Sequence, residues 1–81
     1  MENKWTYYGL KNQSEKLLIQ ESLNQLSSQD RQILVLYYWW GYRDSDIGKI
    51  IGISQQLANY RRNKAIKHFK NIFLNQLHEP D

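Results

Sequence analysis

The sequence predicts an all-α protein, a small bundle of four or five helices. Three observations support this fold class: apolar residues recur at helical spacing, residues that favour helix N-caps precede these stretches, and glycines follow them. A chain of 81 residues has room for one domain, which buries only about 60% of the surface that the unfolded chain exposes. The aromatic content of 14% supplies large apolar side chains for that core.

We expect an N-terminal arm over residues 1–12, a helical domain over residues 13–77 and a tail over residues 78–81. The arm shows no clear periodicity, and it carries an aromatic cluster, Trp5, Tyr7 and Tyr8. The first helix is predicted to begin near residues 12–14, with Glu15 in its first turn, where a negative charge suits the helix dipole. It should end near Leu26, with one apolar face formed by Ile19, Leu23 and Leu26.

The second helix is predicted to begin at Ser27, which can form a capping box with Asp30 three residues later. Residues 33–40 are apolar or aromatic at every position, so periodicity alone does not distinguish a buried strand from a buried helix. The cap and the following Gly41, a residue typical of helix C-termini, favour a helix of roughly a dozen residues. Its apolar character on all sides predicts central burial.

A short third helix is predicted from three cap candidates and first-turn acids, Asp44, Ser45 and Asp46. It runs through Ile47, Ile50 and Ile51 and should stop at Gly52. Ser54 is predicted to cap a fourth helix that continues to about Leu77, and its inward side should comprise Ala58, Ala65, Phe69 and Ile72.

Residues 47–58 have the pattern of a helix-turn-helix. Gly48 provides the small residue required where two helices cross closely, and Gly52 tolerates the positive φ of the turn. A small core between the two helices should contain Ile47, Ile51, Ile53 and Ala58. The alternative interpretation is a tight helical hairpin in a packed bundle, in which the glycines only permit close contact.

The net charge of +3 is unevenly distributed: residues 1–42 carry four basic and four acidic side chains, whereas residues 43–70 carry seven basic and two acidic ones. Residues 54–70 contain five cations and no anion, which is typical of a surface that meets a polyanion. A solvated helix face is the alternative explanation.

In DNA-binding helix-turn-helix proteins the second helix lies in the major groove, and its first two turns contact base edges. We therefore expect base contacts from Gln55, Gln56, Asn59 and Tyr60. Gln and Asn can form paired hydrogen bonds to adenine. Phosphate contacts are expected from the neighbouring cations and the helix cap: Arg43, Lys49, Ser54, Arg61, Arg62, Lys64 and Lys67.

The chain resembles region 4 of the bacterial sigma-70 family, the domain that binds the minus-35 promoter element, over roughly residues 19–73. Residues 26–41 are similar to the family pattern Leu-Pro-x-x-x-Arg-x-Val-Phe/Leu-x-Leu-x-Tyr-Phe-x-Gly, and residues 46–54 to Glu-Ile-Ala-x-Ile-Leu-Gly-Ile-Ser. Downstream, residues of matching type follow at the family's spacing, namely Arg61, Lys64, Ala65 and Phe69.

The resemblance implies a DNA-facing set that comprises Gln55, Gln56, Leu57, Asn59 and Tyr60, with Lys64 near the DNA backbone. Leu57 and Tyr60 occupy positions where the family often has small, polar or basic residues, so the bases recognised here are expected to differ from a standard minus-35 sequence. Ser27 replaces the family's common proline, which changes little because serine also caps helices.

Sigma region 4 also contacts the flap of RNA polymerase through apolar residues of its first two helices, which implies that part of the segment 37–40 is such a surface; core packing is the alternative. The partner-binding candidates are Trp5, Tyr7, Tyr8, Tyr37 and Trp40. For the three aromatic residues of the arm, packing onto their own domain is the alternative. A chain of 81 residues has no room for region 2, so we expect it to act on promoter DNA with RNA polymerase or a subunit that carries region 2. A homodimer, a small regulator with the same fold and an excised domain remain open.

Other classes of function are less well supported. The sequence has no Cys for disulfides or thiolate metal sites, and His68 and His78 have no nearby Asp or Glu arranged as a base partner or metal ligand. His68 is expected to be a weak phosphate contact or a solvated side chain. We therefore predict neither a catalytic site nor a metal or other cofactor. We expect a cytoplasmic protein, because neither a membrane span nor a signal peptide is found. The rival hypothesis is an adaptor that binds the polymerase flap or a sigma antagonist without contacting DNA.

Overall fold

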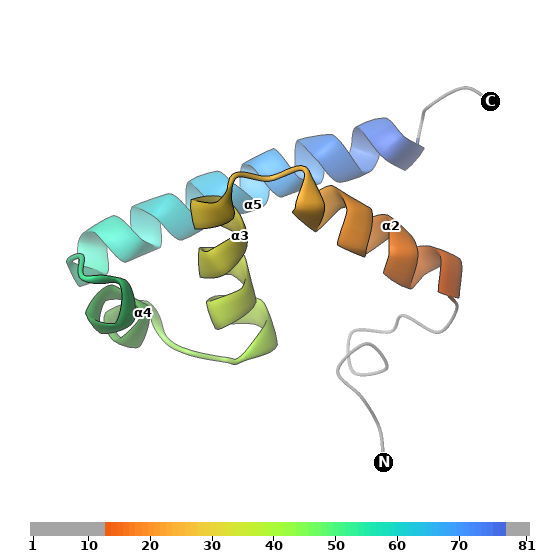
Figure 1. Ribbon diagram of the computed structural model, residues 1–81. Helices are drawn as coiled ribbons and strands as arrows, with labels where there is room; N and C mark the ends of the chain where they lie inside the picture. Colours follow the sequence, from red (N-terminus) through yellow and green to blue (C-terminus); the bar gives the residue numbers. More distant parts are fainter. Residues whose placement is uncertain (1–12, 78–81) are drawn as a thin grey trace, which may run out of the picture.

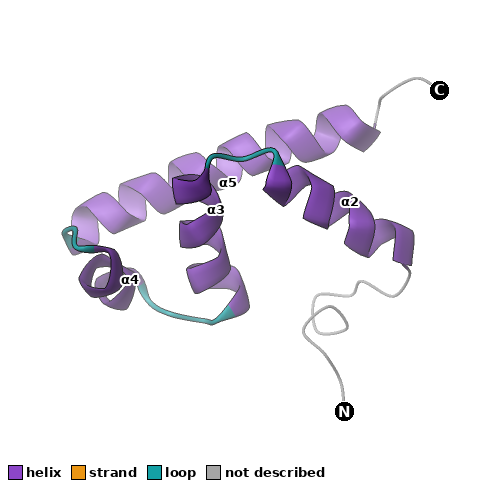
Figure 2. Ribbon diagram, viewed as in Figure 1, coloured by secondary structure: helices purple, strands orange, loops and turns teal. Residues whose placement is uncertain are grey.

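The computed structural model of the chain describes residues 13–77, and every regular element in this range is a helix (Figure 2). In chain order these elements are α2 (Gln13–Asn24), α3 (Ser28–Leu34), the π-helical turn η1 (Val35–Trp39), α4 (Asp44–Ile51) and α5 (Gln55–Leu77). Since η1 continues α3 without a break, the described part contains four helices, as predicted for an all-α bundle.

The long helix α5 is the element on which the other three pack (Figure 1). α4 lies at its N-terminal end, α3 crosses its middle, and α2 lies along its C-terminal half. At that far end Ser22 is fully buried, and its hydroxyl donates a hydrogen bond to Oε1 of Gln76 over 2.7 Å. The C-terminal half of α5 is thus linked to α2, whereas α4 and α3 pack on its N-terminal end and its middle.

The predicted helix ends are confirmed at four positions. The Ser27 hydroxyl accepts a hydrogen bond from the backbone N–H of Asp30 at 3.2 Å, and the Ser54 hydroxyl accepts one from Leu57 at 3.0 Å. Gly41 and Gly52 follow η1 and α4 with φ of +77° and +81°, the left-handed conformation that glycine adopts without steric cost.

The start of α4 differs from the prediction. The N-cap position is occupied by Arg43, which makes no side-chain capping hydrogen bond, and none of the three predicted cap candidates fills it. Asp44 and Asp46 do lie in the first turn, where their charges suit the helix dipole. The Asp44 carboxylate is turned to α5 instead of capping its own helix, because Arg62 and Asn59 of α5 donate hydrogen bonds to it.

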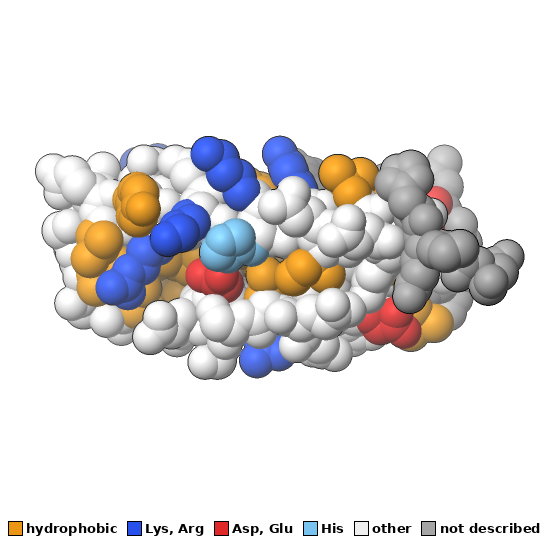
Figure 3. Space-filling view, turned by 90° about the horizontal axis from the view of Figure 1, so that it is seen from above, with side chains coloured by type: hydrophobic (Ala, Val, Ile, Leu, Met, Phe, Trp, Pro, Cys, Tyr) orange, Lys and Arg blue, Asp and Glu red, His pale blue; other side chains and the backbone are white. Residues whose placement is uncertain are grey.

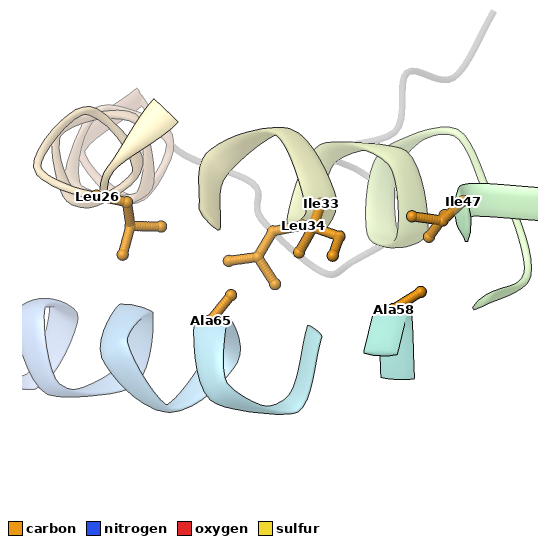
Figure 4. Close-up of a cluster of buried hydrophobic side chains, with 6 residues drawn as sticks. All are labelled: Leu26, Ile33, Leu34, Ile47, Ala58 and Ala65. Atoms are coloured by element: carbon orange, nitrogen blue, oxygen red, sulfur yellow. The ribbon is translucent and has the colours of Figure 1, made fainter. Parts of the chain in front are cut away.

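The buried core is a single layer between α5 and the other helices (Figure 4). Ala58 and Ala65 project from α5, and their small side chains allow the facing helices to approach closely. The larger buried side chains that face them are Leu26, Ile33, Leu34 and Ile47. Phe69 and Ile72 pack against this layer from the predicted inward side of α5, as Leu23 does from α2.

The prediction that residues 33–40 are buried on all sides is wrong. Ile33 and Leu34 are buried, but no residue of η1 is, and Trp40 is 63% exposed. α3 and η1 pack mainly against α5 and α4, and on the side that faces α2 the segment borders an open hollow. Tyr and Trp tolerate this position because each combines a large apolar ring with a polar group that water can solvate.

Candidate nucleic-acid interface

α4, the turn at Gly52 and the start of α5 form a compact pair of helices. A Cβ atom placed on Gly48 would lie 2.6 Å from the carbonyl oxygen of Ile53, so the two helices approach to a distance that excludes a side chain. The Gly48 carbonyl accepts hydrogen bonds from the N–H groups of both Gly52 and Ile53 at 2.8 Å, which closes the end of α4. Ile47 and Ala58 are fully buried between the helices, as predicted.

The predicted base-contacting residues all lie on the exposed surface of the first two turns of α5: Gln55, Gln56, Leu57, Asn59 and Tyr60. Tyr60 is 59% exposed, and Leu57 is 37% exposed. Within the described residues no hydrogen bond occupies the side-chain amide of Gln55 or Gln56. These two amides are therefore available to an incoming ligand.

Most of the predicted phosphate-contacting side chains are also exposed. Arg43, Lys49, Ser54, Arg61, Lys64 and Lys67 are all exposed. Figure 3, which views the molecule from above, shows Lys and Arg side chains gathered over the half that holds α4 and the first turns of α5. Lys64 also places its ammonium 5.8 Å from the centre of the Tyr60 ring, within the range of a cation–π contact.

Arg62 differs from these cations, because it is directed into the protein. Its Nε and Nη2 atoms donate hydrogen bonds to the two carboxylate oxygens of Asp44 over 2.8 and 2.9 Å. Its guanidinium carbon lies 3.9 Å from the centre of the Tyr37 ring. We call Asp44, Asn59, Arg62 and Tyr37 the Asp44 cluster.

The electrostatics of the Asp44 cluster follow from this geometry. The hydrogen bonds from Arg62 lower the pKa of the Asp44 carboxyl, while partial burial opposes them. The same bonds raise the pKa of Arg62 above its ordinary value. Each side chain of the ion pair is only 13% exposed, so water screens this attraction less than it screens a surface pair.

Asn59 is exposed but its amide is already engaged. Its Nδ2 donates to Oδ2 of Asp44 over 2.9 Å, and its Oδ1 accepts from Nδ2 of Asn63 over 3.3 Å. Asn59 thus differs from the two glutamines, whose amides no described residue holds. This difference could not be predicted from local sequence, since Asp44 lies 15 residues away from Asn59.

A second contact between distant residues was also missed by the sequence analysis. Nδ1 of His68 lies 3.0 Å from Oδ2 of Asp30, which is 38 residues away in the chain. The expectation that His68 has no nearby acid is therefore wrong, because the packing of α3 on α5 brings Asp30 to the ring. The contact joins the start of α3 to the middle of α5, and half of the His68 side chain remains exposed.

An apolar hollow of about 550 Å³ lies between α2, the α3–η1 segment and α5. Its walls include Ile19 and Leu23 of α2, Trp39 and Trp40 at the end of the segment, and Phe69 of α5. Of the predicted partner-binding residues, Trp40 lines this hollow, whereas Tyr37 lies under the Arg62 guanidinium. Trp5, Tyr7 and Tyr8 lie outside the described residues.

Residues 13–77 contain no group of three or more His, Cys, Asp or Glu side chains that could hold a metal ion. None of the helices in the same range has the length and apolar character needed to cross a membrane.

A short helix, a glycine turn and a longer helix with an exposed polar first turn define a helix-turn-helix protein. The family model described as Sigma-70, region 4, matches residues 16–69, and the chain therefore belongs to the sigma-70 region 4 family. Its role is thus that of a DNA-binding, sigma-factor-like protein of transcription, and the family is not an enzyme family. Comparisons with curated proteins and with solved structures give no match.

Proposed function

We propose that this protein recognises a promoter element of the minus-35 type by placing the N-terminal half of α5 in the major groove, and that it acts together with RNA polymerase. The observation that carries this proposal is the exposed surface of α5, where unoccupied amides lie among unopposed cations on the second helix of a sigma region 4 domain. Because promoter DNA is its ligand, the protein works in the cytoplasm.

Base recognition is assigned mainly to Gln55 and Gln56. Their amides can pair with the N6 and N7 groups of adenine, and each good bidentate contact contributes about 1 to 3 kcal/mol of discrimination. Leu57 and Tyr60 supply apolar surface that suits the methyl group of thymine. Asn59 belongs to the same set, with its amide in the orientation that Asp44 imposes. The recognised element is thus expected to be rich in A·T pairs.

Phosphate contacts are assigned to the exposed predicted set, which comprises Arg43, Lys49, Ser54, Arg61, Lys64 and Lys67. Each cation that neutralises a phosphate releases a counterion, so affinity should fall steeply as salt rises. Arg62 is not included, because its hydrogen bonds to Asp44 and its contact with Tyr37 direct it away from this surface.

The small DNA-binding surface of this domain indicates that it needs a protein partner to bind its site tightly. One small helix-turn-helix module covers a single half-site, and specific protein–DNA complexes usually bury more surface than such a module offers. Region 4 domains typically bind both promoter DNA and RNA polymerase. We assign the polymerase contact to the apolar hollow and the exposed Trp40 at its edge. A subunit that carries region 2 would then supply the recognition and melting of the minus-10 element.

Selection of bound sequences from random duplex DNA, with and without RNA polymerase, tests the proposal. The expected result is one asymmetric, A·T-rich motif that is enriched more strongly when polymerase is present. A palindromic motif selected equally well without polymerase would replace the polymerase partner with a homodimer. No enrichment in either arm would contradict DNA recognition.

The second candidate function is an adaptor that binds RNA polymerase or a sigma antagonist without contacting DNA, and the apolar hollow favours it. Trp40→Ala and Lys67→Ala separate the two functions. If the protein is an adaptor, Trp40→Ala weakens capture of polymerase and Lys67→Ala changes nothing, and no duplex is bound even at low salt. If the protein recognises DNA, Lys67→Ala weakens duplex binding in the absence of polymerase, whereas Trp40→Ala leaves that binding unchanged.

A further inference from the structure

The Asp44 carboxylate joins three elements of the helix-turn-helix. It is the first residue of α4, it accepts three hydrogen bonds from Asn59 and Arg62 of α5, and Arg62 in turn lies over Tyr37 of η1. All three hydrogen bonds are between 2.8 and 2.9 Å long. Both carboxylate oxygens are therefore occupied by α5.

The chemistry of a carboxylate fixes the amide of Asn59. An ionised carboxylate only accepts hydrogen bonds, so the group of Asn59 that faces Asp44 has to be the NH₂ and not the carbonyl. The carbonyl Oδ1 then points to Asn63, which donates to it. Because Asn59 is exposed beside Gln55 and Gln56, its amide meets an approaching base edge in one orientation only.

The same carboxylate keeps Arg62 away from DNA. An arginine in the second turn of a recognition helix, if free, would contact a phosphate of any sequence and add affinity without discrimination. Here two of its N–H groups are bonded to Asp44, and its guanidinium lies against an aromatic ring. The side chain is left only 13% exposed.

We propose that Asp44 is a specificity-determining positioning residue, which orients the amide of Asn59 for one base pair and withholds Arg62 from the phosphates. This inference rests on the proposed function, because it assigns a role to a residue beside the DNA-contacting surface that does not itself touch DNA. Asp44 thus raises the ratio of specific to non-specific binding.

Asp44→Asn is the principal test, since the two side chains have the same shape. The new amide presents an NH₂ group as well as a carbonyl, so it no longer fixes Asn59 or holds both N–H groups of Arg62. The preference for the base pair that Asn59 contacts should fall roughly tenfold. The slope of log affinity against log salt should steepen by about 0.9, because the released Arg62 neutralises one more phosphate.

Asp46→Asn is the matched control, because it removes the same charge from the same turn of α4 and leaves the Asp44 cluster intact. It should change neither the base preference nor the salt slope. In the double variant Asp44→Asn, Arg62→Gln the slope should return to the wild-type value. Circular dichroism identifies the temperature range in which every variant is folded, and binding is measured there.

The experiment distinguishes failure of the role proposed for Asp44 from failure of DNA recognition as a whole. If the wild type binds no duplex, both are overturned. If the wild type binds its selected site with preference but Asp44→Asn and Asp46→Asn give equal slopes and equal preferences, only the role of Asp44 is overturned. A further check is Asn59→Ala, which should reduce base preference in the wild type and have little effect in the Asp44→Asn background.

Discussion

At the scale of single residues, the exposed surface of α5 contains two kinds of polar side chain. The amides of Gln55 and Gln56 form no hydrogen bond with any described residue, and Lys67 is an exposed cation farther along the same helix. Amides discriminate between bases because their donor and acceptor have to match a base edge, whereas a cation interacts with any phosphate. The two kinds of residue should therefore respond differently to substitution.

Gln55→Ala and Gln56→Ala should each change the sequence preference of binding, with a loss of about 1 to 3 kcal/mol on the preferred site and little loss on other duplexes. Lys67→Ala should weaken binding to every duplex alike and reduce the salt slope by about 1. Fluorescence anisotropy with the selected duplex and a scrambled one measures both effects. Equal losses on both duplexes from all three variants would contradict the assignment of base contacts.

The ion pair between Asp44 and Arg62 predicts a pH dependence of stability. Because the pKa of Asp44 is lower in the folded chain than in the unfolded one, the pair stabilises the fold above the unfolded pKa of about 3.9 and loses this effect as pH falls below it. The wild type should exceed Asp44→Asn by about 2 kcal/mol in free energy of unfolding at pH 7. Urea titrations should show this difference shrinking at about pH 3, and a difference that does not vary with pH would contradict the pairing.

Prediction from sequence succeeded for residues whose roles are local. Ser27 and Ser54 bond to N–H groups three residues away, and Gly52 adopts a conformation set by its own backbone, so the sequence around each position contains the signal. The pairs Asp44–Arg62 and Asp30–His68 span 18 and 38 residues. They form only because α4 and α3 pack on α5, and no local pattern encodes that packing.

At the scale of elements, the crossing of α4 and α5 determines how far the recognition surface projects. The space at Gly48 is closed by backbone atoms of Ile53 and Ser54, which cannot move without shifting the turn. The turn at Gly52 has open space around it but requires a positive φ. Gly48 is thus required because the two helices approach closely, and Gly52 because the turn has a positive φ.

Gly48→Val should destabilise the protein by about 3 kcal/mol, since its branched side chain forces the two helices apart. Lys49→Val is the matched control: it places the same residue at the next, exposed position of α4 and should cost less than about 1 kcal/mol. Chemical denaturation measures both. A Gly48→Val variant as stable as Lys49→Val would show that the close crossing does not contribute to stability.

Gly52→Ala should cost about 1 to 2 kcal/mol through backbone strain alone, because an L-residue at positive φ is disfavoured and no atom within 4 Å would meet the new Cβ. Gly52→Asn should recover part of this loss, since Asn tolerates the left-handed conformation. If the two variants were equally unstable, steric contact and not φ would be the cause.

The boundaries of the aromatic segment were predictable, but its burial was not. Caps and glycines define where α3 and η1 begin and end, and these signals lie within the segment. How many sides of the segment are covered depends on how many helices surround it. Among the described helices, α5 and α4 pack on the segment and α2 borders it across an open hollow, so Tyr38 and Trp40 are exposed although their neighbours Ile33 and Leu34 are buried.

At the scale of the whole molecule, stability depends on a thin core. The buried apolar residues of the described range form one layer, Leu26, Ile33, Leu34, Ile47, Ala58 and Ala65, and α5 contacts all three of the other helices. Since the stability of small domains is typically about 5 kcal/mol, the loss of one large side chain from this layer should affect the whole fold and not only one helix.

Ile33→Ala should cost about 2 to 5 kcal/mol, because it leaves a cavity where the side chain is 2% exposed. Part of the protein should then be unfolded at 25 °C, seen as lost helical circular dichroism and lost DNA binding together. Leu74→Ala, a change on the exposed side of α5, should alter stability by no more than about 0.5 kcal/mol. Equal effects of the two changes would contradict this description of the core.

The central claim is that the exposed surface of α5 recognises duplex DNA, and the most direct test is the affinity for the selected duplex and for a scrambled duplex between about 50 and about 200 mM salt. We predict at least about tenfold preference for the selected duplex at every salt concentration. Both affinities should fall with salt, with a slope near −4.5 if Arg43, Lys49, Arg61, Lys64 and Lys67 each neutralise one phosphate, at about 0.9 for each. No binding at the lowest salt, or equal affinity for the two duplexes, would contradict the claim.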